Sequence, residues 1–159
     1  MKRSILLVAA SLFLVLVQGC DSDSGDDNSG NPAHRQIMSA KVDGGDWQVM
    51  NGTAERVQAQ LRIFGSKATP REEISITLMN VTEPGAYTLG DGHLTRMTFL
   101  RSLGSPEPYL ATSGTVTLTT VDTEFVKGTF AFEATRTTNV VHTVSITDGV
   151  FDVDYTFKF

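Results

Sequence analysis

The stretch FDVDYTFKF, residues 151–159, alternates apolar and polar side chains at every position. Its odd-numbered residues are aromatic or β-branched, and Asp152, Asp154, Thr156 and Lys158 stand between them. Successive side chains of a β-strand point to opposite faces, so this period predicts a strand with one face on a core and the other in water. Removing the strand is expected to expose a large apolar surface, so the C-terminus is predicted to be part of the folded domain and not a tail.

The same period of two recurs along the chain from about residue 36. Residues 57–63, 74–78 and 126–135 each alternate apolar with polar side chains. Antiparallel sheets produce this pattern, whereas parallel sheets give continuous apolar runs. No segment carries a convincing helical stripe. The chain is therefore predicted to be all-β.

Turn residues separate the alternating segments at short intervals, and Asp-Gly pairs supply the positive φ that tight hairpins need. The predicted architecture is an antiparallel β-sandwich or an up-and-down β-barrel of about nine to ten strands. The last four strands are expected to form an up-and-down meander. The expected strands are about 36–43, 46–50, 56–64, 72–80, 86–89, 94–101, 109–121, 125–136, 140–147 and 150–159.

The N-terminus has the organisation of a bacterial export signal. Lys2 and Arg3 give a positive start, and residues 5–17 are apolar apart from Ser11. This run is shorter than the roughly 20 residues that a membrane-spanning helix needs, but it suits the h-region of a signal peptide. Residues 1–19 are therefore predicted to be a cleaved signal peptide.

The sequence Val17-Gln18-Gly19-Cys20 resembles the lipobox of bacterial lipoproteins, with Gln18 as a less usual occupant of its position. The resemblance implies cleavage between Gly19 and Cys20, and it implies that Cys20 carries a diacylglyceryl group and an N-acyl chain. Those chains exceed the two-signal requirement for stable membrane anchoring. Because Cys20 is the only cysteine, the exported domain can form no internal disulfide.

Residues 20–33 are predicted to be a flexible acidic linker, because they contain no large apolar side chain that could repay the entropy of ordering. Acidic residues directly after the lipidated cysteine resemble the surface-export signals of Bacteroidota lipoproteins. Asp21 alone would favour inner-membrane retention in the enterobacterial scheme. The expected location is the cell envelope, with the outer membrane and its surface favoured. Residues 34–159 are predicted to form a single antiparallel β domain.

Three further segments carry a resemblance to a family. They are Met38 to Gly44 followed by Trp47, then Gly128 to Phe132, then Ile146 to Phe151. Together they resemble a family of uncharacterised Bacteroidota cell-envelope lipoproteins of roughly this length, with an all-β domain behind a lipobox. The resemblance covers most of the chain after Cys20. It implies a location and a fold, and it brings no catalytic residue or ligand.

Composition and motifs argue against several activities. The net charge is −5 and there is no basic patch, so a nucleic-acid partner is not expected. No two of the three histidines have ligand spacing, and with one cysteine neither a metal site nor a cofactor is predicted. The chain has no Gly-x-Ser-x-Gly elbow and no phosphate-binding glycine loop. No enzymatic activity is predicted.

Three polar residues of the C-terminal third are candidates for catalysis or metal binding. His142 falls in register with Val144 and Ile146, so it is expected on the buried face, as a hydrogen-bonded core residue in preference to a metal ligand or base. Asp152 and Asp154 lie two apart on one strand, which puts their carboxylates about 7 Å apart, a separation suited to glycoside hydrolysis. Because they alternate with core residues, both are predicted to face solvent instead.

Four large apolar residues are predicted as candidate ligand contacts: Trp47, Met97, Phe99 and Tyr109. Trp47 could stack on a sugar ring or an acyl chain, or plug one end of the core, and the plug is favoured. Segment 94–110 alternates least cleanly, which indicates either burial on both sides or an exposed contact patch.

Three hypotheses for function follow. The first is a non-enzymatic, lipid-anchored envelope protein that binds a glycan, a lipophilic ligand or a protein partner, with a concave pocket or an apolar patch near 94–110. The second is a structural or accessory subunit of an envelope complex, with a flat contact surface or a free sheet edge. A hydrolase is third, and it would need a perturbed carboxylate or histidine in a cleft.

Overall fold

The computed structural model describes residues 35–101, 107–137 and 141–156. No helix within these ranges is long and apolar enough to cross a membrane. The described residues form ten strands, so the all-β prediction is confirmed. The strands are β1 (Gln36–Val42), β2 (Gly45–Val49), β3 (Thr53–Val57), β4 (Gln60–Ala68), β5 (Arg71–Met79), β6 (Gly85–Thr88), β7 (Leu94–Arg101), β8 (Tyr109–Val121), β9 (Phe125–Thr137) and β10 (Val141–Asp154).

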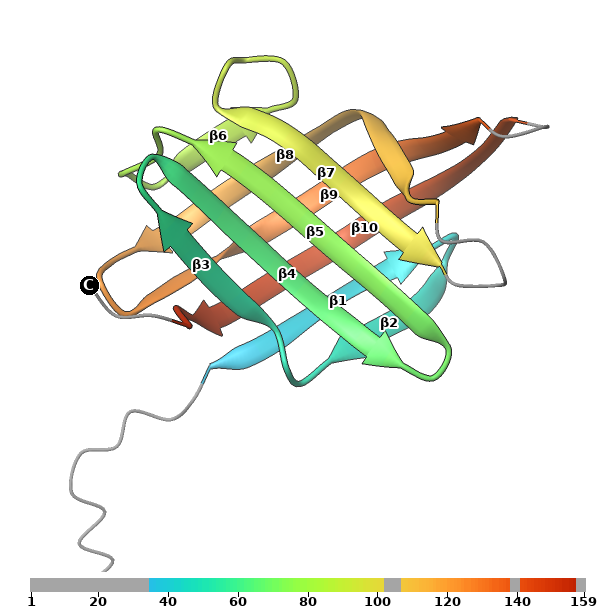
Figure 1. Ribbon diagram of the computed structural model, residues 1–159, viewed down its shortest axis with the longest axis horizontal. Helices are drawn as coiled ribbons and strands as arrows, with labels where there is room; N and C mark the ends of the chain where they lie inside the picture. The colour runs from blue at the N-terminus through green and yellow to red at the C-terminus, as the bar shows by residue number, and fades with distance from the viewer. Residues whose placement is uncertain (1–34, 102–106, 138–140, 157–159) are drawn as a thin grey trace, which may run out of the picture. The chain divides into compact units, whose positions relative to one another are not determined.

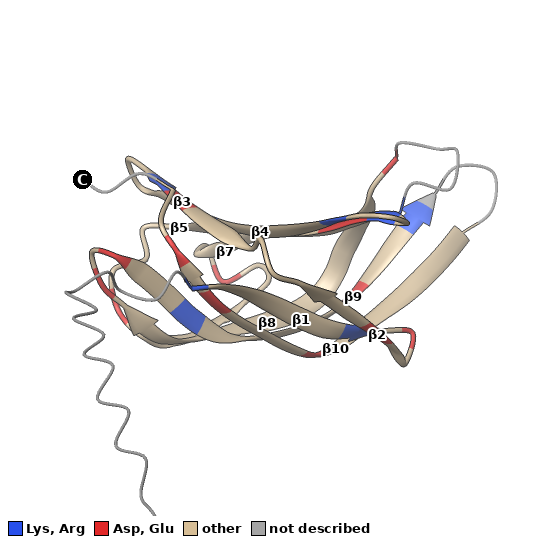
Figure 2. Ribbon diagram, turned by 90° about the horizontal axis from the view of Figure 1, so that it is seen from below, with Lys and Arg blue, Asp and Glu red and all other residues tan. Residues whose placement is uncertain are grey.

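The strands belong to one antiparallel sheet with the order β2-β1-β10-β9-β8-β7-β5-β4-β3, and β6 pairs with β8 beside this path. The sheet curls over on itself, so that β3, β4, β5 and β7 form one layer that crosses a second layer of β8, β9, β10, β1 and β2 (Figure 1). Figure 2 shows the two layers from the side. The fold therefore resembles a half-barrel, between the two architectures that the sequence left open.

The corner of the curled sheet lies between β7 and β8. These strands share only two residue pairs, Thr98 with Leu110 and Phe99 with Tyr109. Farther along, β8 leaves β7 and pairs with β6. At the opposite side, edge strand β3 meets the chain just after β10, where the Thr156 N–H donates to the Ala54 carbonyl at 2.8 Å. That junction is where the candidate site lies.

The inward-facing residues of both layers form one core. Ile74, Ile76 and Leu78 of β5 are fully buried. From the other layer, Phe151 stacks against Phe130 with ring centroids 6.3 Å apart. Alternation in the sequence thus predicted these core faces correctly.

Two predicted strand boundaries are wrong. The expected strand 56–64 is a hairpin, because the chain turns at Gln58, whose φ is +55°, between β3 and β4. Val57 and Ala59, expected to face the core, are exposed as a result. Glutamine is not among the residues that favour turns, so nothing in the local sequence indicates a turn here.

The expected strands 140–147 and 150–159 are one strand, β10. Asp148 and Gly149 were predicted as a turn but lie in a β-bulge, where the register with β9 shifts between Ile146 and Gly149. The positive φ of Asp148, +51°, is used to bend the strand instead of reversing it. The meander therefore has three strands, β8, β9 and β10, and the next neighbour of β10 is β1. Phe157 and Phe159 lie outside the described residues.

Gly128 of β9 occupies a position where a side chain has no room. A Cβ atom there would collide with the Thr117 carbonyl oxygen and would lie 2.7 Å from Cζ of Phe151. We therefore expect Gly128→Ala to lower the free energy of unfolding by about 1–3 kcal/mol through overpacking. Urea denaturation followed by circular dichroism measures this change. Thr129→Ala, at the exposed neighbouring position, is the control, and an equal effect of both variants would contradict the prediction.

Candidate functional site

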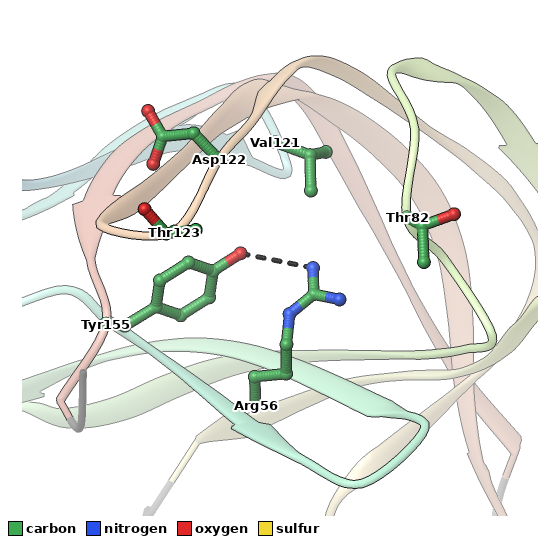
Figure 3. A pocket seen from close by; sticks show the side chains of 6 residues that line it. All are labelled: Arg56, Thr82, Val121, Asp122, Thr123 and Tyr155. Carbon is green, nitrogen blue, oxygen red and sulfur yellow. Dashed lines mark hydrogen bonds between the residues drawn. The ribbon is translucent and has the colours of Figure 1, made fainter. Parts of the chain in front are cut away.

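An open cavity of about 320 Å³ lies at the junction of β3 with the end of β10. Its lining residues come from four separate segments of the chain (Figure 3). β3 contributes Arg56, and Tyr155 follows β10. The β5–β6 connection contributes Thr82, and the β8–β9 turn closes the remaining side. The complete lining is Arg56, Thr82, Val121, Asp122, Thr123 and Tyr155.

Hydrogen bonds to two uncharged groups hold the Arg56 guanidinium in this cavity. Nη1 donates to the Val81 carbonyl at 3.0 Å, and Nη2 donates to the Tyr155 hydroxyl at 3.3 Å (Figure 3). Tyr155 is only 6% exposed. Its backbone N–H donates to the Glu124 carbonyl at 2.9 Å, which fixes the ring beside the β8–β9 turn. The cavity therefore has a preformed cationic wall.

The charge of Arg56 is not neutralised by a carboxylate of the described residues, since no ion pair within 4 Å involves it. Asp122 also lines the cavity, but its Oδ1 accepts the backbone N–H groups of Glu124 and Phe125 at 2.6 and 2.8 Å. In Figure 3 its carboxylate points away from Arg56. Arg62 and Arg101, in contrast, each pair with a glutamate.

The rest of the lining is mainly apolar where it faces Arg56. Val121 closes one side. The hydroxyl oxygens of Thr82 and Thr123 point away from the guanidinium, so their methyl groups are the nearer atoms (Figure 3). The cavity combines one cation with apolar walls, an arrangement typical of small-molecule sites in which few polar groups fix the orientation of a ligand.

Comparison with known proteins places the chain in a family. Residues 34–153 match the family model described as a domain of unknown function, DUF6252. The chain belongs to this family. No curated protein and no solved structure matches the chain. Within DUF6252 the matched range includes Arg56 and the β8–β9 turn, and Tyr155 lies two residues beyond it.

The four predicted ligand contacts are all core residues. Trp47, Met97, Phe99 and Tyr109 are between 0 and 6% exposed, so none of them presents a broad face to solvent. Trp47 is the core plug that the sequence favoured. The three of these side chains that belong to segment 94–110 are therefore buried. Among the described residues of that segment, Leu110 is the large apolar residue that is exposed, at 47%.

His142, Asp152 and Asp154, the polar candidates of the C-terminal third, are not part of the lining of the Arg56 cavity. His142 was expected on the buried face but is exposed. It is the second residue of β10, where the strand pairs with β9 but not yet with β1, and the buried residues of its face begin at Val144. Asp152 is partly exposed and pairs with Arg35 and Lys127 at 3.3 and 3.5 Å. Asp154 accepts the Arg35 backbone N–H at 3.0 Å. His34, Gly19 and Cys20 lie outside the described residues.

A second hollow of about 440 Å³ lies on the outer face of β4, β5 and β7. It reaches Leu100 and Pro108, so it overlaps the segment in which a contact surface was predicted. Arg62 in this hollow is paired with Glu73 at 3.8 Å and donates to the Ser75 hydroxyl at 3.3 Å. Arg62 already has a carboxylate partner, and Arg96, the other arginine of this lining, is exposed to solvent, whereas Arg56 is partly buried. The Arg56 cavity is therefore the stronger candidate site. The described residues contain no group of three or more His, Cys, Asp or Glu side chains that could hold a metal ion.

Asp91, in the turn before β7, shows how the backbone of this domain binds a carboxylate. Hydrogen bonds from the backbone N–H groups of Leu94, His93 and Thr88, at 2.9, 2.7 and 2.7 Å, lower the pKa of Asp91 below its usual value of 3.8. A carboxylate with a depressed folded-state pKa stabilises the fold above its unfolded pKa, and this contribution is lost as pH falls through the folded value.

We therefore expect the Asp91 carboxyl to titrate below pH 3.8 in an NMR pH titration, and the 88–94 turn to loosen as it protonates. Asp91→Asn should remove this pH dependence from the amide shifts of the turn. Glu83→Gln, in the preceding connection, is the control that should leave it intact. An Asp91 pKa at or above 3.8 would contradict the assignment.

Proposed function

We propose that this chain is a non-enzymatic, lipid-anchored binding protein of the bacterial cell envelope, and that its β domain binds a small molecule in the Arg56 cavity. The proposal has two parts, a cellular location and an activity, and each has its own support and its own test.

The proposed location rests on the N-terminal sequence. The apolar run 5–17 and the lipobox-like Val17-Gln18-Gly19-Cys20 support export followed by lipidation of Cys20. The acidic residues that follow favour the outer membrane and its surface. Residues 33–159 form one compact unit, which the linker would hold near the membrane without burying it.

One observation carries the activity: a half-buried arginine without a carboxylate partner among the described residues faces an open cavity. Burying a cation costs free energy unless it is paired, so such a group is an unusual component of a purely structural surface. The accessory-subunit hypothesis requires a flat contact surface and no cavity. The cavity therefore favours a binding module.

Antibody labelling tests the proposed location. An epitope inserted in the 21–33 linker should be reachable on intact cells if the domain is displayed outside. Labelling only after permeabilisation would contradict surface display and direct the search towards periplasmic ligands. A periplasmic protein of known location, tagged with the same epitope, shows that the cells are intact.

Ligand screening by NMR tests the activity. The chain from residue 20 onwards with Cys20→Ser, labelled with ¹⁵N, is exposed to mixtures of small acids, amines, sugars and neutral apolar compounds. Binding should shift the amide signals of residues 56, 82, 121–123 and 155. If ligands shift only signals of the β4-β5-β7 outer face, or none at all, the Arg56 cavity is not the binding site.

A further inference from the structure

We infer that the Arg56 cavity selects a carboxylate carried on a short apolar body. This inference rests on the proposed function and names the ligand class of the same site. The guanidinium of Arg56 would bind the carboxylate, and Val121 with the threonine methyl groups would contact the apolar part.

The hydrogen-bonding groups that Arg56 and Tyr155 can offer to a ligand are donors. A guanidinium has five N–H donors, and Arg56 uses one on the Val81 carbonyl and one on the Tyr155 hydroxyl. The other three N–H groups have no hydrogen-bond partner among the described residues, which leaves them for a ligand. The Val81 carbonyl accepts from Arg56, and Val81 is not part of the cavity lining. The Tyr155 hydroxyl accepts from Arg56, so its own hydrogen is available to donate. A ligand that only accepts hydrogen bonds matches this set.

Among acceptors, the charge balance favours a singly charged anion. The cavity lining contains one cation, and the Asp122 carboxylate lies at its rim. A phosphate with close to two negative charges would be repelled by Asp122 and would find no second cation in the lining. The planar guanidinium matches a carboxylate in charge and in shape.

The size and walls of the cavity specify the rest of the ligand. A volume of about 320 Å³ is near the lower limit for small-molecule sites. Val121 and the methyl sides of Thr82 and Thr123 offer no hydrogen bond towards Arg56 (Figure 3). A short aliphatic or aromatic chain therefore fits better than a polyhydroxylated ring. Such a carboxylate could be a free acid or the C-terminus of a peptide.

Titrations with matched probes test the inference. Sodium hexanoate, hexanamide and hexylammonium share one apolar chain and differ in the head group. Monitored by the amide shifts of residues 56, 82, 121–123 and 155, hexanoate should bind at least about tenfold more tightly than the other two, as expected for a charge-assisted hydrogen bond. N-acetylleucine, which presents the carboxylate of a peptide end, distinguishes the source. Tighter binding of hexanoate indicates a free acid as the ligand, and tighter binding of N-acetylleucine indicates the C-terminus of a peptide. Either result supports the inference.

Three variants test whether Arg56 is the source of this selectivity. Arg56→Gln should weaken hexanoate binding at least about tenfold and leave hexanamide binding nearly unchanged. Arg96→Gln, which removes an exposed arginine outside this lining, is the matched control and should change neither. If Arg56→Gln unfolds, Thr82→Phe narrows the cavity at an exposed position and should weaken hexanoate binding without touching Arg56.

Equal binding of hexanoate and hexanamide at these residues would overturn the carboxylate assignment but leave the cavity as a binding site. Equal losses in Arg56→Gln and Arg96→Gln would also overturn it. If the mixtures of the wider screen shift the amide signals of the cavity residues but none of the matched probes does, the cavity binds a ligand of another class and the inference is wrong. If neither the probes nor the mixtures shift these signals, the proposal that the cavity binds a small molecule is wrong.

Discussion

Replacing Trp47 by alanine is expected to lower the free energy of unfolding by about 3–5 kcal/mol, a large part of the 5–15 kcal/mol typical of a domain. Trp47 is 1% exposed and is among the largest fully buried side chains. Its ring packs against Gly65 of β4, where an added Cβ would lie only 3.3 Å from Cη2. The side chain thus fills the space between β2 and β4, and its removal leaves a cavity that the two backbones cannot close.

Chemical denaturation followed by far-ultraviolet circular dichroism measures this loss, because the variant no longer contains a tryptophan for fluorescence. Trp47→Phe is expected to cost markedly less, since it keeps most of the ring volume and removes an indole N–H that has no hydrogen-bond partner in the described structure. Gln48→Ala, at the exposed next residue, is the surface control. A loss for Trp47→Ala no greater than that for Gln48→Ala would show that Trp47 is not part of the core.

Cys20→Ser is expected to move the protein from the membrane fraction to the soluble periplasmic fraction. If Cys20 carries the acyl chains that the lipobox-like sequence implies, they are the only anchor proposed, and serine accepts no thioether-linked diacylglyceryl group. Each buried CH₂ of an acyl chain contributes about 0.8 kcal/mol to membrane binding, so loss of the chains changes the partition by many orders of magnitude.

Cell fractionation with immunoblotting measures the distribution, and metabolic labelling with a fatty-acid analogue shows whether the chain is acylated. Ser22→Ala, two residues into the linker, is the control and should remain in the membrane fraction. Acylation of the Cys20→Ser variant would disprove the assignment of Cys20.

The sequence predicted those parts of the fold that depend on local alternation. Ile74, Ile76 and Leu78 face the core because every second residue of a half-buried strand must do so, and the Asp43-Gly44 turn forms because both residues adopt positive φ. Asp148-Gly149 carries the same signal and forms a bulge instead. Whether such a pair reverses a strand or bends it depends on the neighbouring strands β1 and β9, which local sequence does not specify.

The Arg56 cavity could not have been found in this way. Its lining comes from residues 56, 82, 121–123 and 155, which only the curling of the sheet brings together. In the sequence, Arg56 is one polar residue at the start of an expected strand, and Tyr155 is one aromatic residue in an alternating run. The four aromatic and sulfur-containing candidates, in contrast, were selected for apolar surface, which is the property that buries a side chain in a core.

The position of β1 constrains how the domain can acquire its structure. β1 is an inner strand between β2 and β10, and Arg35, at its start, hydrogen-bonds with Asp154, 119 positions farther along the chain. During vectorial synthesis or secretion, the first strand must therefore wait unpaired on one side until the last one emerges. Such long-range pairing raises the contact order and slows folding. During that interval β1 and its apolar residues lack one of their two neighbouring strands, and an unpaired strand edge of this kind is prone to aggregation until β10 is in place.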